Sequence, residues 1–488
     1  MKTLKIAIVH HHLRGGGVTK VIERAVEALL EYPVKVCVIS GEEGAVKNSS
    51  LKKNHLVVSG LSYGEKTPPK TSSELKNEVI KRATEYFGEK VDVWHIHNHT
   101  LGKNAAYTEF GTLLAEQGEH VYFQLHDFSE DNRPLNYVHL AASIGQDGAS
   151  VTQKMYPLGS HVLYGVLNGR DHGILKKAGI AEDKLNIVSN PVVVQNRIEY
   201  GNRPALKGIE KLFLYPVRAI PRKNIGELAF WSALANEGEH FAITLAPKNL
   251  KYQKFYKQWV EYAEEMNLPI TFEAGKKWGL SYPELLDTSY GIVTTSIQEG
   301  FGLVYLESWV QGKPLYGRIL PDITRDFYNN EIRFPGMYTR LMIPVEWVGE
   351  MALKAELRQE IKKLLKNYGQ KFSTKNVESW LEVMLEEKHI DFGRLSSALQ
   401  RKVITLIMKN PGLQKELPVL ESTLIEAETI QSNKRVVEEE YNLEEYGESL
   451  YQLYKKLAVT TPSVVEYVEP DGVLHQFLSP VEFSLLRG

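Results

Sequence analysis

Two carboxylates beside a pair of glycines form the part of the sequence best suited to chemistry. They lie in Glu299-Gly-Phe-Gly-Leu-Val-Tyr-Leu-Glu307, which follows an apolar run and leads into an apolar segment that favours a helix. Glycines let the backbone approach a ligand closely, and free N–H groups at a helix start attract an anion. Glu307 follows Glu299 by about two helical turns, so we expect both carboxylates to line one face of a ligand site.

Each carboxylate has a functional and a structural interpretation. Glu307 lies among apolar residues at 303–310, where a charge is costly unless it is paired or bound to ligand hydroxyls. A carboxylate can accept two hydroxyl donors, which matches the vicinal diol of a ribose. Glu299 would then meet a sugar ring through the loop. In the structural alternative, Glu299 caps the helix and Glu307 is a surface residue.

A basic constellation precedes these carboxylates in the chain. It is Tyr215-Pro-Val-Arg218-Ala-Ile-Pro-Arg222-Lys223-Asn224, placed where a predicted strand ends and a helix begins. Cations are unfavourable at a helix start unless an anion binds there. A guanidinium grips a diphosphate with two hydrogen bonds, and an ammonium adds a point charge. Arg218 and Lys223 could thus neutralise a departing nucleoside diphosphate without a metal; the alternative is a solvated basic turn.

A glycine loop near the N-terminus has the same placement. Arg14-Gly-Gly-Gly17-Val-Thr follows the first predicted strand and precedes a helix, so Gly16 and Gly17 could hold a phosphate. The loop lacks the GxGxxG dinucleotide fingerprint, which argues against a nicotinamide dehydrogenase. A plain tight turn explains the loop equally well.

Histidines gather at predicted strand ends. His126 follows the strand 121–125 and is placed to hydrogen-bond a sugar hydroxyl, although a capping or core histidine fits as well. His10 to His12 are consecutive, and His95, His97 and His99 alternate along one strand face. No carboxylate or cysteine spacing completes a metal site, so we expect a polar rim and no metal.

The elements that position these residues alternate in type along the chain. In the first half we predict strands at 5–9, 34–40, 91–96 and 121–125, and helices at 18–30 and 72–87. The pattern restarts near residue 211, with strands at 211–217, 241–246, 270–273 and 291–295 and helices at 225–235, 252–266, 282–286 and from 303. Strands that are apolar throughout are typical of parallel sheets covered on both faces. The sequence therefore predicts an α/β protein with two doubly wound, Rossmann-like domains that face each other across a cleft.

The domain boundaries follow from this pattern and from chain length. A chain of 488 residues is too long for one ordinary core. We predict an N-terminal domain at 1–200, a polar linker around 200–208, and a second domain at 206–350. Strand signals stop after about residue 350. A helical region at 351–436 and a C-terminal helix and tail at 437–488 complete the prediction, with helices at 354–368, 377–388, 394–408 and 438–457.

Composition restricts the partners and the compartment. The net charge of −2 gives no basic bias of the kind that nucleic-acid binding requires. Cys37, the single cysteine, is expected to be a buried strand residue in a reducing compartment. No apolar run reaches the length of a signal peptide or membrane helix, so we expect a cytoplasmic protein. A peripheral membrane contact stays open without support, and the oligomeric state is not predicted.

Taken together, these motifs and their order resemble the retaining GT-B glycosyltransferases of family 4. Gly-Gly-Gly17-Val resembles the donor-phosphate loop of that family, and Asp92-Val-Trp-His-Ile-His97 resembles its DVVHxH strand end. Arg218 and Lys223 have the spacing of its GRLxxxKG clamp, and Thr295-Ser-Ile-Gln-Glu299-Gly-Phe-Gly resembles PSxxEGFG. Residues 446–454 resemble the helix that crosses back onto the first domain. The likeness covers about residues 1–320 plus this helix.

The resemblance implies a donor site and an activity, with the domain at 1–200 on the acceptor side and the domain at 206–350 on the nucleotide-sugar side. It implies that Gly16, Gly17, Arg218 and Lys223 hold the donor diphosphate and that Glu307 binds the ribose. Glu299 and the backbone of Gly300, Phe301, Gly302 and Leu303 would hold the hexose, with His126 beside the transferred sugar. The implied reaction transfers a hexosyl group from a UDP- or GDP-hexose to a hydroxyl of a small-molecule or glycan acceptor, with retention of configuration. It needs no obligatory cofactor, only the nucleotide-sugar substrate.

Some features depart from the family pattern. Its NGVD element is Asn190-Pro191 here, and residues from 322 to about 434 carry no motif that we can place. Arg14, Arg318 and Arg325 could suit a phosphorylated or carboxylated acceptor, or could be ordinary surface arginines. Two other functions stay open: a non-catalytic binding or scaffold protein of this fold, and a GT-B relative with epimerase or phosphorylase chemistry.

Overall fold

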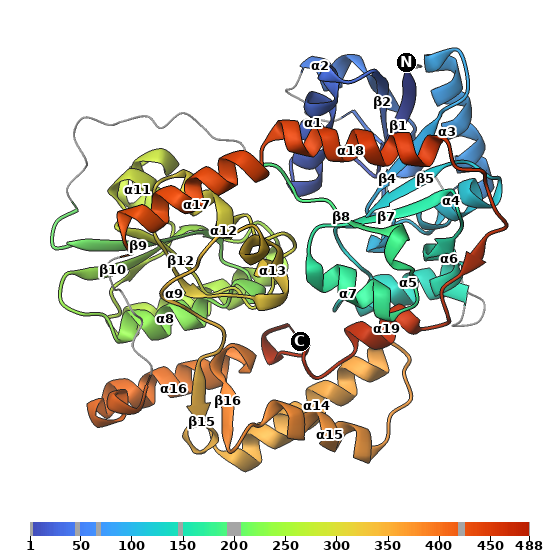
Figure 1. The fold of residues 1–488 in the computed structure, drawn as a ribbon. Helices are drawn as coiled ribbons and strands as arrows, with labels where there is room; N and C mark the ends of the chain where they lie inside the picture. The colour runs from blue at the N-terminus through green and yellow to red at the C-terminus, as the bar shows by residue number, and fades with distance from the viewer. Residues whose placement is uncertain are drawn as a thin grey trace. The chain divides into compact units, whose positions relative to one another are not determined.

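The protein forms two compact units that share the chain unevenly. A computed structural model describes residues 3–43, 49–64, 70–144, 150–192, 206–417 and 425–487 (Figure 1). The first unit comprises Met1–Val193, Lys366–Gln370 and Tyr441–Leu478, and the second comprises Val194–Leu365, Lys371–Glu440 and Ser479–Gly488. Most of the predicted linker at 200–208 lies outside the described residues.

The first unit is built on a seven-stranded sheet in the order β3-β2-β1-β4-β5-β7-β8. All its neighbouring strands are parallel. The strands are β1 (Leu4–His10), β2 (Val34–Ser40), β3 (His55–Val57), β4 (Val93–His97), β5 (Val121–Gln124), β7 (Val162–Val166) and β8 (Leu185–Ile187). The longer helices are α1 (Gly17–Ala28), α3 (Ser72–Phe87), α4 (Ala105–Glu116), α5 (Pro134–Ile144), α7 (Gly169–Lys177) and α18 (Leu443–Ala458). Shorter elements are α2 (Ser49–Lys53), α6 (Ser150–Met155), α19 (Gly472–Phe477) and the antiparallel pair β6 (Pro157–Leu158) with β17 (Glu466–Tyr467).

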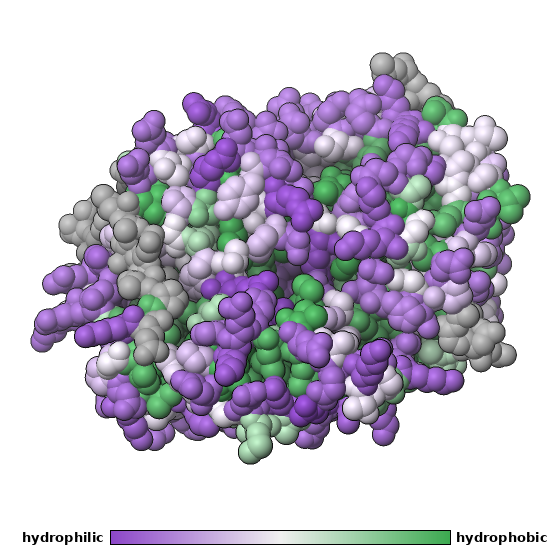
Figure 2. Space-filling view, turned by 60° about the horizontal axis from the view of Figure 1, so that its bottom comes forward, coloured by the Kyte–Doolittle hydropathy of each residue, from purple (hydrophilic) through white to green (hydrophobic). Residues whose placement is uncertain are grey.

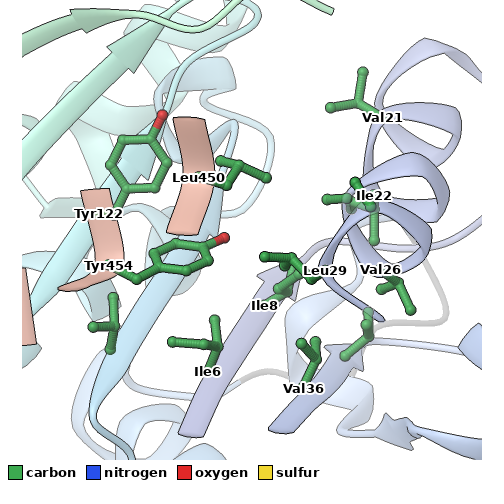
Figure 3. Packing of buried hydrophobic residues seen from close by; sticks show 14 of the residues in the cluster. Ile6, Ile8, Val21, Ile22, Val26, Leu29, Val36, Tyr122, Leu450 and Tyr454 are labelled. Atoms are coloured by element: carbon green, nitrogen blue, oxygen red, sulfur yellow. The ribbon is translucent and has the colours of Figure 1, made fainter. Parts of the chain in front are cut away.

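The core of this unit includes α18, which begins more than 250 residues after β8, the last strand of the sheet in the sequence. Figure 3 shows side chains of β1, β2 and α1 packed with Leu450 and Tyr454 of α18. The Tyr454 hydroxyl lies 2.7 Å from His95 Nδ1, and both residues are fully buried. Helix α18 therefore covers the sheet of the first unit with an apolar face that also satisfies a buried histidine.

The second unit contains a six-stranded parallel sheet in the order β11-β10-β9-β12-β13-β14. Its strands are β9 (Lys211–Arg218), β10 (Glu239–Leu245), β11 (Ile270–Thr271), β12 (Gly291–Thr294), β13 (Leu315–Arg318) and β14 (Met337–Tyr338). Its helices include α8 (Ile225–Ala233), α9 (Gln253–Glu265), α10 (Ala274–Trp278), α11 (Tyr282–Thr288), α12 (Val304–Val310), α13 (Pro321–Asn329) and α17 (Ala427–Glu440). Two parallel α/β sheets confirm the predicted fold class.

The segment after β14 differs from the prediction. It contains a short antiparallel pair, β15 (Met342–Pro344) with β16 (His389–Asp391), beside α14 (Glu350–Asn367), α15 (Thr374–Met384) and α16 (Ser397–Lys409). The expectation of no strand after residue 350 was therefore wrong, since a three-residue strand is too short to show a period in sequence. A helix predicted to reach residue 388 ends at Met384.

The segment predicted as one helix at 438–457 is divided between two helices. Helix α17 ends at Glu440, and α18 begins after Asn442. The Asn442 side chain accepts a hydrogen bond of 2.9 Å from the Glu445 N–H, so it caps the new helix. This short break separates α17 of the second unit from α18 of the first.

No helix in the described ranges is both long enough and apolar enough to cross a membrane. On the face seen in Figure 2, hydrophilic residues cover most of the surface, and hydrophobic residues form smaller groups among them. Exposed apolar side chains, such as Leu135 and Met351, are ordinary on protein surfaces.

Candidate functional site

Two neighbouring strands of the second unit bring one predicted cation, Lys223, together with the carboxylate of Glu299. Strands β9 and β12 are adjacent and parallel, so the loops at their carboxyl ends meet at one edge of the sheet. The first loop holds the 3-10 helix η5 (Pro221–Lys223) and Asn224; the second runs from Thr295 to Gly300. We call these the cation loop (residues 219–224) and the carboxylate loop (residues 295–300).

The two loops are tied by hydrogen bonds to main-chain oxygens. The Ile297 N–H donates to the Arg222 carbonyl at 3.0 Å. The Thr295 hydroxyl donates to the carbonyls of Lys223 and Asn224 at 3.1 and 3.0 Å, and the Tyr215 hydroxyl also donates to the Lys223 carbonyl at 3.0 Å. These bonds fix the backbone from which both charges project.

Glu299 is a buried carboxylate held by two cations. The Lys223 ammonium forms an ion pair with Oε1, and Arg222 Nη1 lies 3.2 Å from Oε2. Burial alone would raise the pKa of Glu299, but the charges of Lys223 and Arg222, with hydrogen bonds from Lys223 and Ser296, lower it to about 2. Burial lowers the pKa of Lys223 despite the attraction of Glu299. Glu299 is therefore ionised at neutral pH and fixed in place.

Arg222 is the second cation that contacts Glu299, and it was not among the residues that we predicted for the site. Arg218, at the end of β9, is exposed, and in the described part of the chain its side chain has no ion pair or hydrogen bond. It is free to meet a ligand but does not contact Glu299. Arg222 is next to Lys223 in the basic constellation, and that adjacency was the available signal.

The glycine turn after Glu299 has one open position and one position in the left-handed conformation. Gly300 is exposed, and a Cβ placed there would meet no atom within 4 Å. Gly302 has φ +89°, where a Cβ would lie 2.8 Å from the Tyr305 ring, so only glycine fits. Phe301 is buried with its ring against Phe327 at 5.5 Å. Leu303 is the N-cap of α12. The main chain is thus open at Gly300 and anchored on either side.

Glu307 does not have the predicted burial. It lies on α12, but it is exposed, whereas Leu306 and Ser308 beside it are buried. The argument that an apolar neighbourhood buries this charge was wrong, because the seven-residue helix directs position 307 to the outer face. Burial raises the pKa of the Tyr282 hydroxyl, and the nearby charge of Glu307 adds to this effect, so that the pKa is about 12. Contact with a ribose stays a prediction.

The glycine loop of the first unit lies at the start of α1. Gly16 is the N-cap residue and provides no side-chain cap. A Cβ at Gly15 or Gly17 would meet no atom within 4 Å. Arg14, beside the loop, is exposed and paired with Glu42, with Nε 2.5 Å from Oε1. The first turn of α1 can therefore receive an anion without a steric obstacle.

His126 belongs to a set of histidines at the ends of β1, β4 and β5. Its Nε2 lies 3.0 Å from His97 Nδ1, and the two rings stack at 5.3 Å. Burial lowers the pKa of His126 to about 4, and it lowers the pKa of His95 to about 3. His126 is therefore neutral near pH 7, which suits a hydrogen bond to a hydroxyl. Within the residues that the structure describes, no group of three or more His, Cys, Asp or Glu side chains could hold a metal ion.

The arginines considered for an acidic acceptor have different places. Arg318 is buried and bonded to two carboxylates, Glu227 at 2.6 Å and Asp391 at 2.7 Å, so the expectation that it meets an acceptor was wrong. Arg325 is exposed and pairs with Asp322 at 3.1 Å.

The fold and the relatives of the chain agree on its class. Sucrose-phosphate synthase from Thermosynechococcus elongatus is similar in structure (TM-score 0.53, 13% identity, 93% of this chain and 99% of that chain). HepE from Anabaena, solved with UDP and glucose, is similar too (TM-score 0.54, 12% identity, 93% and 99%). A glycosyltransferase from Rickettsia africae gives a TM-score of 0.52 at 13% identity, over 94% and 100% of the two chains. The fold is that of the GT-B glycosyltransferases.

A similarity in sequence supports enzyme activity. The chain is 26% identical, over 470 residues, to mannosylglucosyl-3-phosphoglycerate synthase from Petrotoga mobilis. The match covers 91% of this chain and 89% of that protein. No protein-family model matches the chain. Together with the fold, this relative identifies the chain as a glycosyltransferase of GT-B type.

Proposed function

We propose that the protein is a retaining hexosyltransferase that uses a UDP- or GDP-hexose and acts on a small phosphorylated glycoside. The name of the Petrotoga relative describes a product in which mannose is joined to glucosyl-3-phosphoglycerate. A mannosyl donor and a glucosyl-3-phosphoglycerate acceptor are therefore our first choice for this chain. The proposal extends the class, glycosyltransferase, to a donor, an acceptor and a stereochemical course.

The observation that carries the proposal is the state of Glu299. Its pKa of about 2 keeps it ionised, so it cannot act as a general acid at neutral pH. A fixed, buried carboxylate beside an open glycine turn is suited to accept hydrogen bonds from sugar hydroxyls. Lys223, Arg222 and the exposed Arg218 supply positive charge at the same sheet edge for a diphosphate.

The chemistry then depends on charge stabilisation. The bond between the anomeric carbon and the diphosphate oxygen breaks, and the cations of the cation loop stabilise the charge that develops on the leaving group. The acceptor hydroxyl forms the new bond from the same face, and its proton passes to the departing phosphate oxygen. This route needs no protein nucleophile. It also needs no obligatory metal, which predicts that activity survives treatment with a chelator.

The remaining predicted residues keep the roles that the resemblance implies. Gly16 and Gly17 would receive phosphate at the start of α1, and Glu307 would bind the ribose. The neutral imidazole of His126 would bond a hydroxyl of the transferred sugar. We also propose a cytoplasmic location, which fits a lone cysteine that is buried and has its thiol pKa raised to about 12 by burial.

A donor and acceptor panel tests the proposal. UDP-, GDP- and ADP-hexoses are first compared for the rise in melting temperature that they cause. The best donor is then incubated with glucosyl-3-phosphoglycerate or with the same glycoside lacking phosphate, and the products are identified by mass spectrometry and NMR. We expect a disaccharide product with retained configuration and a preference for the phosphorylated acceptor.

Matched variants connect turnover to the site. Glu299→Gln and Lys223→Met should each reduce turnover by roughly 100-fold or more, whereas Lys257→Met, at an exposed lysine of α9, should leave it unchanged. Equal turnover in all three would contradict the proposal. Donor binding without any transfer would favour the scaffold alternative, and an altered sugar without transfer would favour an epimerase.

A further inference from the structure

Part of the segment at 322–434, in which the sequence showed no recognisable motif, contacts the cation loop. Gln400 of α16 donates from Nε2 to Asn224 Oδ1 at 2.8 Å, and its Nε2 also contacts the Phe392 carbonyl at 3.1 Å. Asn224 follows Lys223 directly and is fully buried. Both Asn224 and Gln400 belong to the second unit.

Asn224 is the conformational pivot of the cation loop. Its φ of +46° lies in the left-handed region, which an asparagine adopts more readily than most residues. Its amide is held at both ends: Oδ1 accepts from Gln400, and Nδ2 donates to Glu227 Oε2 at 2.7 Å. Its carbonyl accepts the Thr295 hydroxyl from the carboxylate loop. Asn224, next to Lys223, is therefore bonded to α16, to α8 and to the carboxylate loop.

The same segment also contacts Asn224 indirectly, through Glu227, the hydrogen-bond partner of the Asn224 amide. Glu227 also accepts from Arg318 (Nε to Oε1, 2.9 Å) and from the Tyr338 hydroxyl at 2.7 Å. Asp391 at the end of β16 holds the other side of Arg318 through two hydrogen bonds, at 2.7 and 2.8 Å. Thus Asp391 reaches Asn224 through Arg318 and Glu227, and all four residues are buried.

Two glycines make this approach possible. A Cβ at Gly226 on α8 would lie 2.1 Å from Gln400 Oε1 and 2.5 Å from Trp259. A Cβ at Gly393 would lie 2.8 Å from Arg318 Nη2 and 2.9 Å from Ile297 of the carboxylate loop. The close packing thus brings the segment against both loops of the candidate site.

We propose that Gln400 and Asp391 are positioning residues of the donor site, which hold Asn224 so that Lys223 and Glu299 face the donor diphosphate and hexose. The proposal rests on the proposed function for the identity of the ligand. It gives a role to residues 389–400, for which the sequence offered none.

Removing the Gln400 amide tests the proposal. Gln400→Met keeps the length of the side chain but leaves Asn224 Oδ1 without its donor. We expect UDP or GDP, whichever the wild-type protein binds, to bind about five- to tenfold more weakly by calorimetry, the size of one lost hydrogen bond. The KM for the donor should rise by a similar factor, and the KM for the acceptor should not change.

The control breaks a different hydrogen bond of the same helix. Thr405 of α16 bonds the Tyr262 hydroxyl of α9 at 2.9 Å, so Thr405→Val loosens α16 without touching Asn224. It should leave nucleotide affinity unchanged. In an Asn224→Gly background, which keeps the left-handed conformation accessible, Gln400→Met should have no further effect on affinity.

A measurement on the ligand-free protein separates this inference from the proposed function. Hydrogen exchange of peptides spanning 220–226 and 295–300 should become faster in Gln400→Met and remain as in wild type in Thr405→Val. This result would support positioning even if neither nucleotide binds the wild-type protein. Unchanged exchange, unchanged affinity for a nucleotide that the wild type binds, or an equal loss in Thr405→Val would overturn the inference.

Discussion

Replacing Glu299 with glutamine should weaken the second unit in a way that depends on pH. Burial opposes ionisation of Glu299, but Lys223 and Arg222 lower its pKa from 4.5 to about 2. At about 1.4 kcal/mol for each tenfold change in proton affinity, this depression corresponds to about 3 kcal/mol of stability. Glutamine has the shape of the protonated acid and cannot provide this contribution.

The sign follows from the direction of the pKa change. A carboxyl group with a lowered pKa in the folded state stabilises the protein above its unfolded pKa, here 4.5, and loses that contribution as the pH falls toward about 2. The difference between wild type and Glu299→Gln should therefore be up to about 3 kcal/mol at pH 7 and about 2 kcal/mol at pH 3.5. Burial lowers the pKa of Lys223. Because burying that cation also costs free energy, the net contribution of the Lys223–Glu299 ion pair to stability is smaller, roughly 1–3 kcal/mol.

Tryptophan fluorescence during urea unfolding can measure this difference. Six of the seven tryptophans, all except Trp94, belong to the second unit, so the signal follows the unit that contains Glu299. Comparing the two proteins at pH 7 and pH 3.5 cancels the titration of the other groups. Equal stabilities at pH 7, or a difference that grows as the pH falls, would refute the reasoning.

Two further predictions concern buried charges outside the loops. Arg318→Met should destabilise the second unit by about 3–5 kcal/mol in urea unfolding, because it leaves Glu227 and Asp391 buried without a cation; the exposed Arg325→Met should change stability by less than about 1 kcal/mol, and similar effects would contradict this assignment. In the first unit, burial raises the pKa of Glu130 to about 7, a carboxyl that accepts the Tyr156 and Ser129 hydroxyls at 3.0 Å. The contribution of Glu130 to stability should therefore be fully present below pH 4.5 and be lost as the pH rises through about 7. Calorimetry should show that wild type loses up to about 3 kcal/mol of stability relative to Glu130→Gln between pH 5 and pH 8. A stability difference that is constant with pH would contradict this prediction.

Local signals were sufficient for many of the elements. The strand at 34–40 and the helix at 72–87 were predicted with the bounds that the structure gives. The first is a β-branched apolar run, and the second has Thr71 and Glu74 as a capping box and Gly88 as a left-handed C-cap. Such features act over a few residues, so they can be read without knowledge of the fold. No element was predicted between residues 126 and 210, where β7 and α7 lie.

Burial was predicted less well than element type. Glu307 was expected to have a costly charge because its sequence neighbours are apolar, but it is exposed, whereas Arg318 was considered for an acceptor and is buried. For both residues, the sequence shows the neighbours along the chain and not those across the sheet. A seven-residue helix such as α12 is also too short for its apolar period to identify the outer face.

The sequence by itself determined the parallel α/β class, the order of the glycine and cation motifs, and the candidate carboxylate Glu299. The tertiary structure alone decided which charges meet. Lys223 and Glu299 are 76 residues apart and form a pair because β9 and β12 are neighbours in the sheet. Arg318 meets Asp391, 73 residues later, because the segment after β14 returns to the same unit. Residue types and local spacing specify elements, but the ion pairs that set the pKa of Glu299 arise only when strands from distant parts of the chain are adjacent.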